Sequence, residues 1–241
     1  MQTSGTEIDV PFREVPYLPL KLKVTKRDDG AFLLTNGQPL RPSPDHMLAP
    51  LVYWAANTPQ NVWLAQRDES RPDHWIELTY GNALLRIRRL VQGLINLGAG
   101  PATPVMILSR NSIEHALIMY AAMWAGCPVV PVTPAYALLS QDFQRLKYVD
   151  SLVEPAIIYV DDGIEYQRGL QGMGVGTRTV IYAKNAPDTE NSVSLEALES
   201  PPTSQVDLRY DDLSGETVAK YMLTSGSTGE PKAVINTHAM I

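Results

Sequence analysis

The residues with the clearest chemical meaning lie at positions 224–232, which read TSGSTGEPK. Glycines let a backbone turn sharply and bring its N–H groups close to an anion, hydroxyls add neutral donors, and a lysine adds a mobile positive charge. A hydrogen bond to a charged group contributes about 1.5–3 kcal/mol, so several converging donors can hold a polyphosphate without a rigid cage. The segment therefore predicts a phosphate-binding loop.

The spacing in this segment excludes the P-loop of kinases and GTPases. In a P-loop the lysine directly follows a glycine and precedes a serine or threonine. Here Pro231 precedes Lys232 and Ala233 follows it. By composition alone the segment also fits a flexible surface loop rich in serine and glycine. A phosphate loop of another kind and a plain surface loop are the two alternatives that remain.

The elements upstream of this segment predict a scaffold that could position it. A strand is expected at 217–223, immediately before the loop, and further apolar strands are expected at 105–108, 129–132, 156–160 and 179–182. Segments with helical periodicity separate these strands, and each parallel step in a sheet needs such a crossover connection. The alternation predicts an α/β fold with a mostly parallel sheet flanked by helices.

Helices are expected both before and between these strands. The apolar pattern predicts one helix over 47–58, a long amphipathic one over 84–95 and a short one through 143–149. Another is expected to begin at Asn111, because Glu114 follows three residues later and the pair resembles a capping box.

Three segments fall outside the regular alternation. The strand-like runs at 62–65 and 75–79 are expected to pair as a hairpin. The polar, proline-rich residues 186–212 are expected to form a connecting loop with one modest helix around 194–198. Residues 1–47 show no sustained helical period and are expected to form an extension, either an arm or a small β element.

Composition restricts which binding partners and which cellular compartment are expected for this protein. The formal net charge is -6 and the basic residues are scattered, so no nucleic-acid surface is expected. The start of the sequence lacks the basic and apolar regions of a secretory signal. The single cysteine, Cys127, cannot form an intrachain disulfide and is expected to be a buried structural thiol. A cytoplasmic protein is therefore predicted.

One uncharged stretch, 116–141, is long enough in principle to cross a bilayer. Gly126 and the prolines Pro128, Pro131 and Pro134 divide it into a helix, a short strand and a loop. No membrane span is therefore expected.

Several polar residues are expected to have structural roles. The four histidines lack the spacing of metal ligands, so no metal site is predicted. They are His46, His74, His115 and His238. The aspartate pairs at 161–162 and 211–212 are typical of turns or helix caps rather than of a catalytic carboxylate pair.

Arginines and tryptophans of the expected helices are also assigned to the scaffold. Arg86, Arg88 and Arg89 lie mostly off the apolar face of the long helix and are expected to be solvated. Trp54 and Trp124 are expected to pack in the core, because large aromatic rings bury much apolar area.

Nearly position for position, TSGSTGEPK resembles the phosphate loop of the adenylate-forming superfamily, which includes acyl-CoA synthetases, luciferases and the adenylation domains of nonribosomal peptide synthetases. Upstream, residues 78–80, 111–114 and 126–136 look like its N-terminal subdomain, so the resemblance extends from Leu48 to the last residue. Ala233 departs from the pattern, since many members carry glycine after the lysine. The departure bears on how the loop closes over ATP and leaves the phosphate donors untouched.

Within the superfamily, residues 11–13, 29–30, 39–40, 54–55 and 231–238 are most similar to feruloyl-CoA synthases. This resemblance implies an ATP-dependent carboxylate–CoA ligase for an aromatic acid. The carboxylate would attack the α-phosphate of Mg²⁺-bound ATP to give acyl-AMP and pyrophosphate, and the thiol of coenzyme A would then displace AMP. A fatty-acyl-CoA ligase or a peptide-synthetase adenylation domain is the alternative.

The resemblance also implies how the loop would hold the β- and γ-phosphates of ATP. Its hydroxyls would donate hydrogen bonds, its glycines would allow close backbone approach, and its lysine would supply the counter-charge. The implied ATP-binding residues are Thr224, Ser225, Gly226, Ser227, Thr228, Gly229 and Lys232. Catalytic residues are left unassigned.

Later elements of the superfamily are absent from the sequence: the adenine-binding and magnesium-binding segments, the ribose-binding aspartate, and the C-terminal domain with its catalytic lysine. Residues 48–241 are therefore expected to be an incomplete N-terminal AMP-binding domain that ends just after the phosphate loop, preceded by the extension at 1–47. This polypeptide alone is expected to have little or no ligase activity. A non-catalytic truncated remnant is a further alternative.

Overall fold

The structure, a computed structural model, describes residues 21–39, 43–224 and 229–241. The chain divides into two compact units, Met1–Ser43 and Pro44–Ile241. The second unit contains the segment predicted to bind phosphate and the sheet that positions it.

A β-hairpin is the regular structure of the first unit. β1 (Leu22–Lys26) and β2 (Phe32–Asn36) pair antiparallel. Gly30 lies between them with a φ of 85°, a left-handed conformation that glycine adopts without a steric penalty. The hairpin confirms that this part of the chain forms a small β element.

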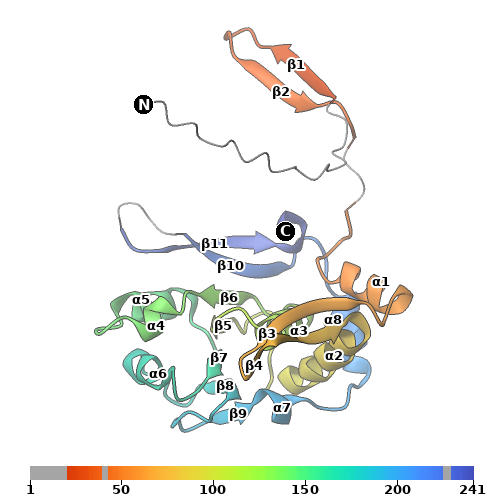
Figure 1. Ribbon diagram of the computed structural model, residues 1–241. Coiled ribbons are helices and arrows are strands. Elements are labelled where there is room, and N and C mark those ends of the chain that lie inside the picture. The colour runs from red at the N-terminus through yellow and green to blue at the C-terminus, as the bar shows by residue number, and fades with distance from the viewer. Residues whose placement is uncertain (1–20, 40–42, 225–228) are drawn as a thin grey trace, which may run out of the picture. The chain divides into compact units, whose positions relative to one another are not determined.

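A seven-stranded sheet forms the centre of the second unit (Figure 1). Neighbouring strands are parallel except for the antiparallel pair β10 and β11. In sheet order the strands are β11 (Lys232–Thr237), β10 (Val218–Thr224), β6 (Val129–Val132), β5 (Val105–Leu108), β7 (Ile157–Asp162), β8 (Thr179–Lys184) and β9 (Ser192–Ser194). β5 is buried along its whole length, as expected for an apolar run in a parallel sheet. The predicted α/β class with a mostly parallel sheet is confirmed.

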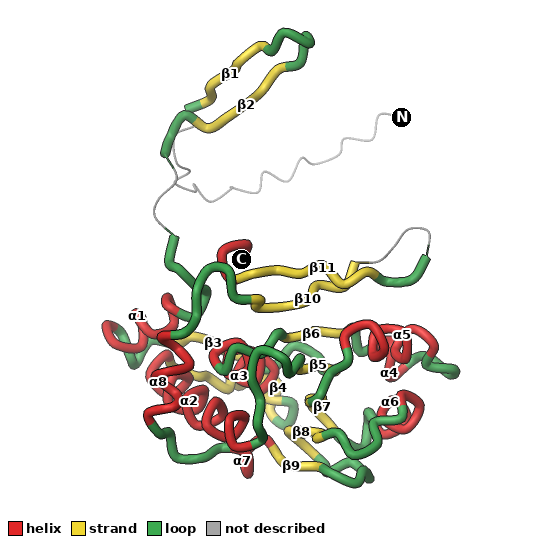
Figure 2. Tube along the Cα trace, turned by 180° about the vertical axis from the view of Figure 1, so that it is seen from behind, coloured by secondary structure: helices red, strands yellow, loops and turns green. Residues whose placement is uncertain are grey.

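Helices cover both faces of this sheet, in two groups that Figures 1 and 2 show on opposite sides. Val105 and Ile107 of β5 face one core, whereas Met106 and Leu108 face the other, because successive side chains of a strand alternate. The first core is covered chiefly by α2 (Tyr80–Asn96) and α3 (Ile113–Trp124). The second is covered by α4 (Ala135–Leu138), α5 (Gln144–Val153) and α6 (Gln167–Met173).

The remaining early elements also match the sequence pattern. α1 (Ala49–Asn57) packs on α2, and β3 (Val62–Asp68) pairs with β4 (Arg71–Thr79) as a separate hairpin. Cys127 is buried as predicted, and burial raises the pKa of its thiol to about 12. Among the helices that the structure describes, none is both long and apolar enough to cross a bilayer.

The helix cap predicted at Asn111 was wrong by one residue. Ser112 is the N-cap of α3, and its Oγ accepts the N–H of His115 at 3.0 Å. The N–H of Ile113 donates to the side chain of Gln66 in β3 at 2.8 Å. A residue distant in sequence therefore helps to set where the helix begins.

In residues 186–212 the predicted helix around 194–198 is confirmed, but the prediction that the rest is a connecting loop was wrong. The segment contains β9, α7 (Leu195–Leu198) and α8 (Ser204–Asp211). Val206 of α8 is fully buried, and its carbonyl accepts the indole N–H of Trp124 at 2.8 Å. α8 has little apolar periodicity of its own, so its stability depends on packing against α3.

The arginines of α2 are not simply solvated, which corrects a further prediction. Arg86 Nε lies 2.9 Å from Glu199 Oε1, and Arg88 Nη1 lies 2.6 Å from Asp207 Oδ1. Arg89 lies 3.9 Å from the same glutamate. The carboxylates come from the segment of α7 and α8, so the pattern of α2 alone could not reveal them.

The two tryptophans expected in the core differ in their environments. Trp124 is 2% exposed, which confirms the prediction. Trp54 is 44% exposed, so its assignment to the core was wrong. α1 buries Leu51 and Ala55 instead, and the Trp54 ring meets only the edge of Tyr53 among the described aromatic residues.

Candidate functional site

The predicted phosphate loop connects the last two strands of the sheet. β10 ends at Thr224, β11 begins at Lys232, and these two residues are opposite each other in the hairpin. The hydroxyl of Thr224 donates a long hydrogen bond, 3.5 Å, to the carbonyl of Lys232. Four predicted site residues lie outside the described residues: Ser225, Gly226, Ser227 and Thr228.

The described residues of this connection are open to solvent. Thr224, Gly229 and Lys232 are exposed, and a Cβ added at Gly229 would meet no atom of the described residues within 4 Å. Within the part of the chain that the structure describes, the Lys232 ammonium has no hydrogen-bond or ion-pair partner. An anion could therefore approach both the backbone at Gly229 and the charge of Lys232.

The parallel sheet determines where this connection lies. β10 runs parallel to β6, with Lys220 opposite Val129, so both strands end at the same edge. This carboxyl edge is where open α/β sheets bind ligands. Thr224 and Lys232, the described residues at which the two strands meet this segment, thus lie at the carboxyl edge of the sheet.

A buried histidine pair anchors the far end of β11. His238 follows this strand, donates its backbone N–H to the carbonyl of Thr217 at 3.0 Å, and has its ring centroid 5.9 Å from that of His46. The two side chains are 4% and 7% exposed. Among the described residues, Nδ1 of His46 and both ring nitrogens of His238 have no hydrogen-bond partner. Burial, reinforced by the neighbouring His46, lowers the pKa of His238 to about 4.

Stability is expected to fall as the pH drops below 6.5. The folded-state pKa of His238, about 4, is below its ordinary value of 6.5, so the unfolded chain binds this proton first. The neutral His238 therefore contributes to the free energy of unfolding above pH 6.5, and this contribution is lost as the pH falls toward 4. At pH 5 the loss is about 2 kcal/mol. Urea unfolding at pH 7 and pH 5 measures the loss. His238→Phe is expected to remove most of it, and an equal loss in both proteins would contradict the assignment.

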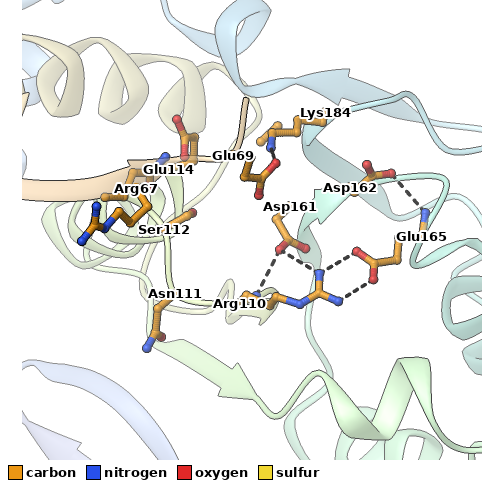
Figure 3. A pocket seen from close by; sticks show the side chains of 12 residues that line it. Arg67, Glu69, Arg110, Asn111, Ser112, Glu114, Asp161, Asp162, Glu165 and Lys184 are labelled. Atoms are coloured by element: carbon orange, nitrogen blue, oxygen red, sulfur yellow. Dashed lines mark hydrogen bonds and ion pairs between the residues drawn. The ribbon is translucent and has the colours of Figure 1, made fainter. Parts of the chain in front are cut away.

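A second polar region opens at the same sheet edge, between the ends of β5 and β7 (Figure 3). This region, which we call the switch-point cleft, has a volume of about 400 Å³ and is lined by five carboxylates and three cations. Its side chains come from the β3–β4 hairpin, the start of α3, and the ends of β7 and β8.

Ion pairs hold much of the switch-point cleft in place. Arg110, just after β5, binds Glu165 through two hydrogen bonds of 2.6 and 2.5 Å, which lower the pKa of that carboxyl. The backbone N–H of Arg110 donates to Asp161 Oδ2 at 3.2 Å. Lys184 lies 2.9 Å from Glu69. These contacts join the ends of three neighbouring strands to the β3–β4 hairpin.

The aspartate pairs fit their predicted roles only in part. Asp162 Oδ1 accepts the N–H groups of Ile164 and Glu165, and Asp212 is the C-cap of α8, as expected for turns and caps. Asp161 and Asp162 also line the switch-point cleft, which the turn prediction did not anticipate. The sequence signal for this cleft was the presence of polar residues directly after apolar strands. The sequence does not show which of those strands are neighbours in the sheet, so the cleft could not be predicted.

The histidines occupy three different environments. His46 and His238 form the buried pair, His74 is exposed on β4, and His115 Nδ1 lies 2.7 Å from Ser109 Oγ. Among the described residues, no group of three or more His, Cys, Asp and Glu side chains could hold a metal ion.

Comparison with known sequences points to one family. The family model described as AMP-binding enzyme matches residues 51–241. Phosphinothricin tripeptide synthetase PhsB of Streptomyces viridochromogenes is 27% identical over 89% of this chain. The L-proline–[L-prolyl-carrier protein] ligase of Streptomyces coelicolor is 26% identical over 68% of the chain, and 4-coumarate–CoA ligase 3 of Arabidopsis thaliana is 28% identical over 66%. The chain spans 16%, 30% and 27% of these relatives, respectively.

Solved structures show the same fold. A luciferase-like enzyme from the mealworm Zophobas morio matches 84% of this chain with a TM-score of 0.66 and 20% identity, over 45% of its own length. A fatty acyl-adenylate ligase from L. pneumophila matches 80% of this chain with a TM-score of 0.58 and 17% identity, over 30% of its length.

Proposed function

This chain belongs to the AMP-binding enzyme family, and from that premise we propose that it carries the phosphate loop of an ATP-dependent carboxylate–CoA ligase. We assign residues 48–241 to part of the N-terminal AMP-binding domain and residues 1–47 to an extension. The observation that supports this most is the position of the exposed residues Thr224 and Lys232 at the carboxyl edge of a parallel sheet, with no partner for the lysine among the described residues.

The proposed chemistry is limited by charge. A carboxylate must attack the α-phosphorus of Mg²⁺-bound ATP, so two anions have to be brought together and oriented. We assign Lys232 as counter-charge to the β- and γ-phosphates, Gly229 as a point of close backbone approach, and Thr224 as the entry of the loop. The hydroxyls and the glycine in 225–228 would supply the other donors. Pyrophosphate then leaves, and the thiol of coenzyme A displaces AMP to give the acyl-CoA.

The proposed substrate is an aromatic acid, with ferulate as the representative compound. This choice is supported by the similarity of five short segments to feruloyl-CoA synthases and by 4-coumarate–CoA ligase 3 among the relatives. The peptide synthetase and the prolyl-carrier-protein ligase favour a second candidate, an adenylation domain that activates an amino acid.

An ATP–pyrophosphate exchange assay tests the proposal and separates these candidates. The complete translated product of the gene is supplied with ATP, Mg²⁺, labelled pyrophosphate and one acid at a time: ferulate, decanoate or a mixture of amino acids. Exchange that is strongest with ferulate supports the aromatic ligase. Exchange only with amino acids or decanoate would replace it with the corresponding alternative. No exchange with any acid would favour a non-catalytic remnant.

Lys232→Ala is expected to weaken pyrophosphate binding by this chain roughly tenfold or more, because a hydrogen bond to a charged group contributes about 1.5–3 kcal/mol. Amide hydrogen exchange in β10 and β11, followed during a pyrophosphate titration, gives the dissociation constant. Lys147→Ala is the control, since this lysine is exposed on α5. Equal weakening in both variants would show that general charge, and not the loop, attracts the anion.

A further inference from the structure

A single buried side chain anchors the end of the sheet's edge strand. Residues 232–241 comprise β11 and the short 3₁₀ helix η1 (His238–Met240), and among them only His238 is buried. Val234 and Ile235 of β11 are 47% and 58% exposed. Hydrogen bonds to β10 hold the strand along its length, and burial of the His238 ring fixes its end.

Backbone hydrogen bonds tie this end to the segment that precedes β10. The N–H of His238 donates to the carbonyl of Thr217 at 3.0 Å, and that of Ala239 donates to the carbonyl of Gly215 at 2.9 Å. The ring of His238 lies 5.9 Å from that of His46, measured between centroids. Because η1 has no other buried side chain, loss of the ring's burial would leave these two hydrogen bonds open to water.

A proton on His238 would be an uncompensated charge in this position. Among the described residues, neither ring nitrogen has a hydrogen-bond partner and no carboxylate acts on the ring. Burying an unpaired charge is costly, so the buried ring is strongly favoured in its neutral form. The neighbouring His46 adds to this cost, because it also disfavours a positive charge on His238.

Groups on the neighbouring elements do not supply the missing countercharge. Burial lowers the pKa of His46, and Asp45 beside it offsets only part of this effect. Tyr210 of α8 lies 4.7 Å from the His46 ring, and burial raises the pKa of its phenol, so it stays neutral. The charged residues of β10 and β11, Lys220 and Lys232, are positive. The nearest carboxylates along the chain are exposed to solvent: Asp211, Asp212 and Glu216.

We propose that the His46–His238 pair is an acid-sensitive latch: a proton on His238 expels its ring, and η1 and the end of β11 open while the rest of the sheet stays folded. Opening is local because β11 has no fully buried side chain, whereas every residue of β5 is buried. β11 begins at Lys232, but the latch does not depend on what the 224–232 loop binds.

Native-state amide hydrogen exchange of the full chain tests the latch. Protection factors of the His238 and Ala239 amides, corrected for the intrinsic exchange rate at each pH, are compared at pH 7.5 and pH 5. With a pKa of 6.5 in the open state and about 4 in the closed state, the open state becomes about 30-fold more populated at pH 5. This loss of protection is expected to be the same in sub-denaturing urea, since local opening exposes little surface. Exchange in β5 should instead accelerate with urea.

Two variants identify the group that titrates. His238→Phe keeps an aromatic ring and the backbone N–H but cannot be protonated, so it is expected to abolish the pH response. His74→Phe removes an exposed histidine of β4 and should retain the response. The urea dependence of the wild-type amides distinguishes local from global opening even where His238→Phe does not fold. The proposal is overturned by pH-independent protection of the His238 and Ala239 amides, by a urea dependence equal to that of β5, or by an unchanged response in His238→Phe.

Discussion

Replacing Trp124 by alanine is expected to lower the free energy of unfolding by about 3–5 kcal/mol. The side chain is 2% exposed at the centre of the larger core, so its removal leaves a cavity that rigid neighbours cannot fill. Its indole N–H donates to the carbonyl of Val206 at 2.8 Å, and its ring lies 4.6 Å from that of Tyr210. The substitution therefore also removes the main link between α3 and α8.

Urea unfolding followed by circular dichroism measures this effect. Trp54→Ala is the matched control, because that tryptophan is 44% exposed, and it is expected to cost less than about 1 kcal/mol. Hydrogen exchange should also accelerate in α8 more than in β5 in the Trp124 variant. Similar losses in the two alanine variants would contradict the role assigned to Trp124.

Gly93→Ala is expected to destabilise the protein by about 3 kcal/mol, although alanine is the better helix former by about 1 kcal/mol. Gly93 lies in α2 where α7 ends against it. A Cβ there would lie 2.0 Å from the carbonyl oxygen of Leu198 and 2.8 Å from its Cγ. A backbone atom cannot rotate away, so the two helices would have to separate.

Thermal or urea unfolding of Gly93→Ala should therefore show a clear loss. Gly229→Ala is the matched glycine control for stability, because a Cβ there would meet no described residue within 4 Å. A neutral or stabilising effect of Gly93→Ala would show that α2 and α7 do not pack as closely as described.

Most elements of the second unit could be predicted from the sequence because their signals are local. β5 reads as an apolar run, and α2 places Ile87, Leu90 and Leu94 on one buried face, so short-range periodicity was sufficient. The segment 224–232 could be recognised for the same reason, since hydroxyls, glycines and a lysine lie within one short stretch. Its assignment to phosphate remains a prediction, because 225–228 lie outside the described residues.

Tertiary structure decided the features whose partners are far apart in the chain. Arg86 and Glu199 are separated by 113 residues, and α8 depends on Trp124 for burial, so neither follows from a local pattern. The switch-point cleft exists because β6 and β7 lie on opposite sides of β5. The sequence by itself therefore predicted most of the strands and helices, and it predicts a phosphate loop at 224–232. The order of strands in the sheet, set by long-range packing, decided which charged side chains meet at its edge.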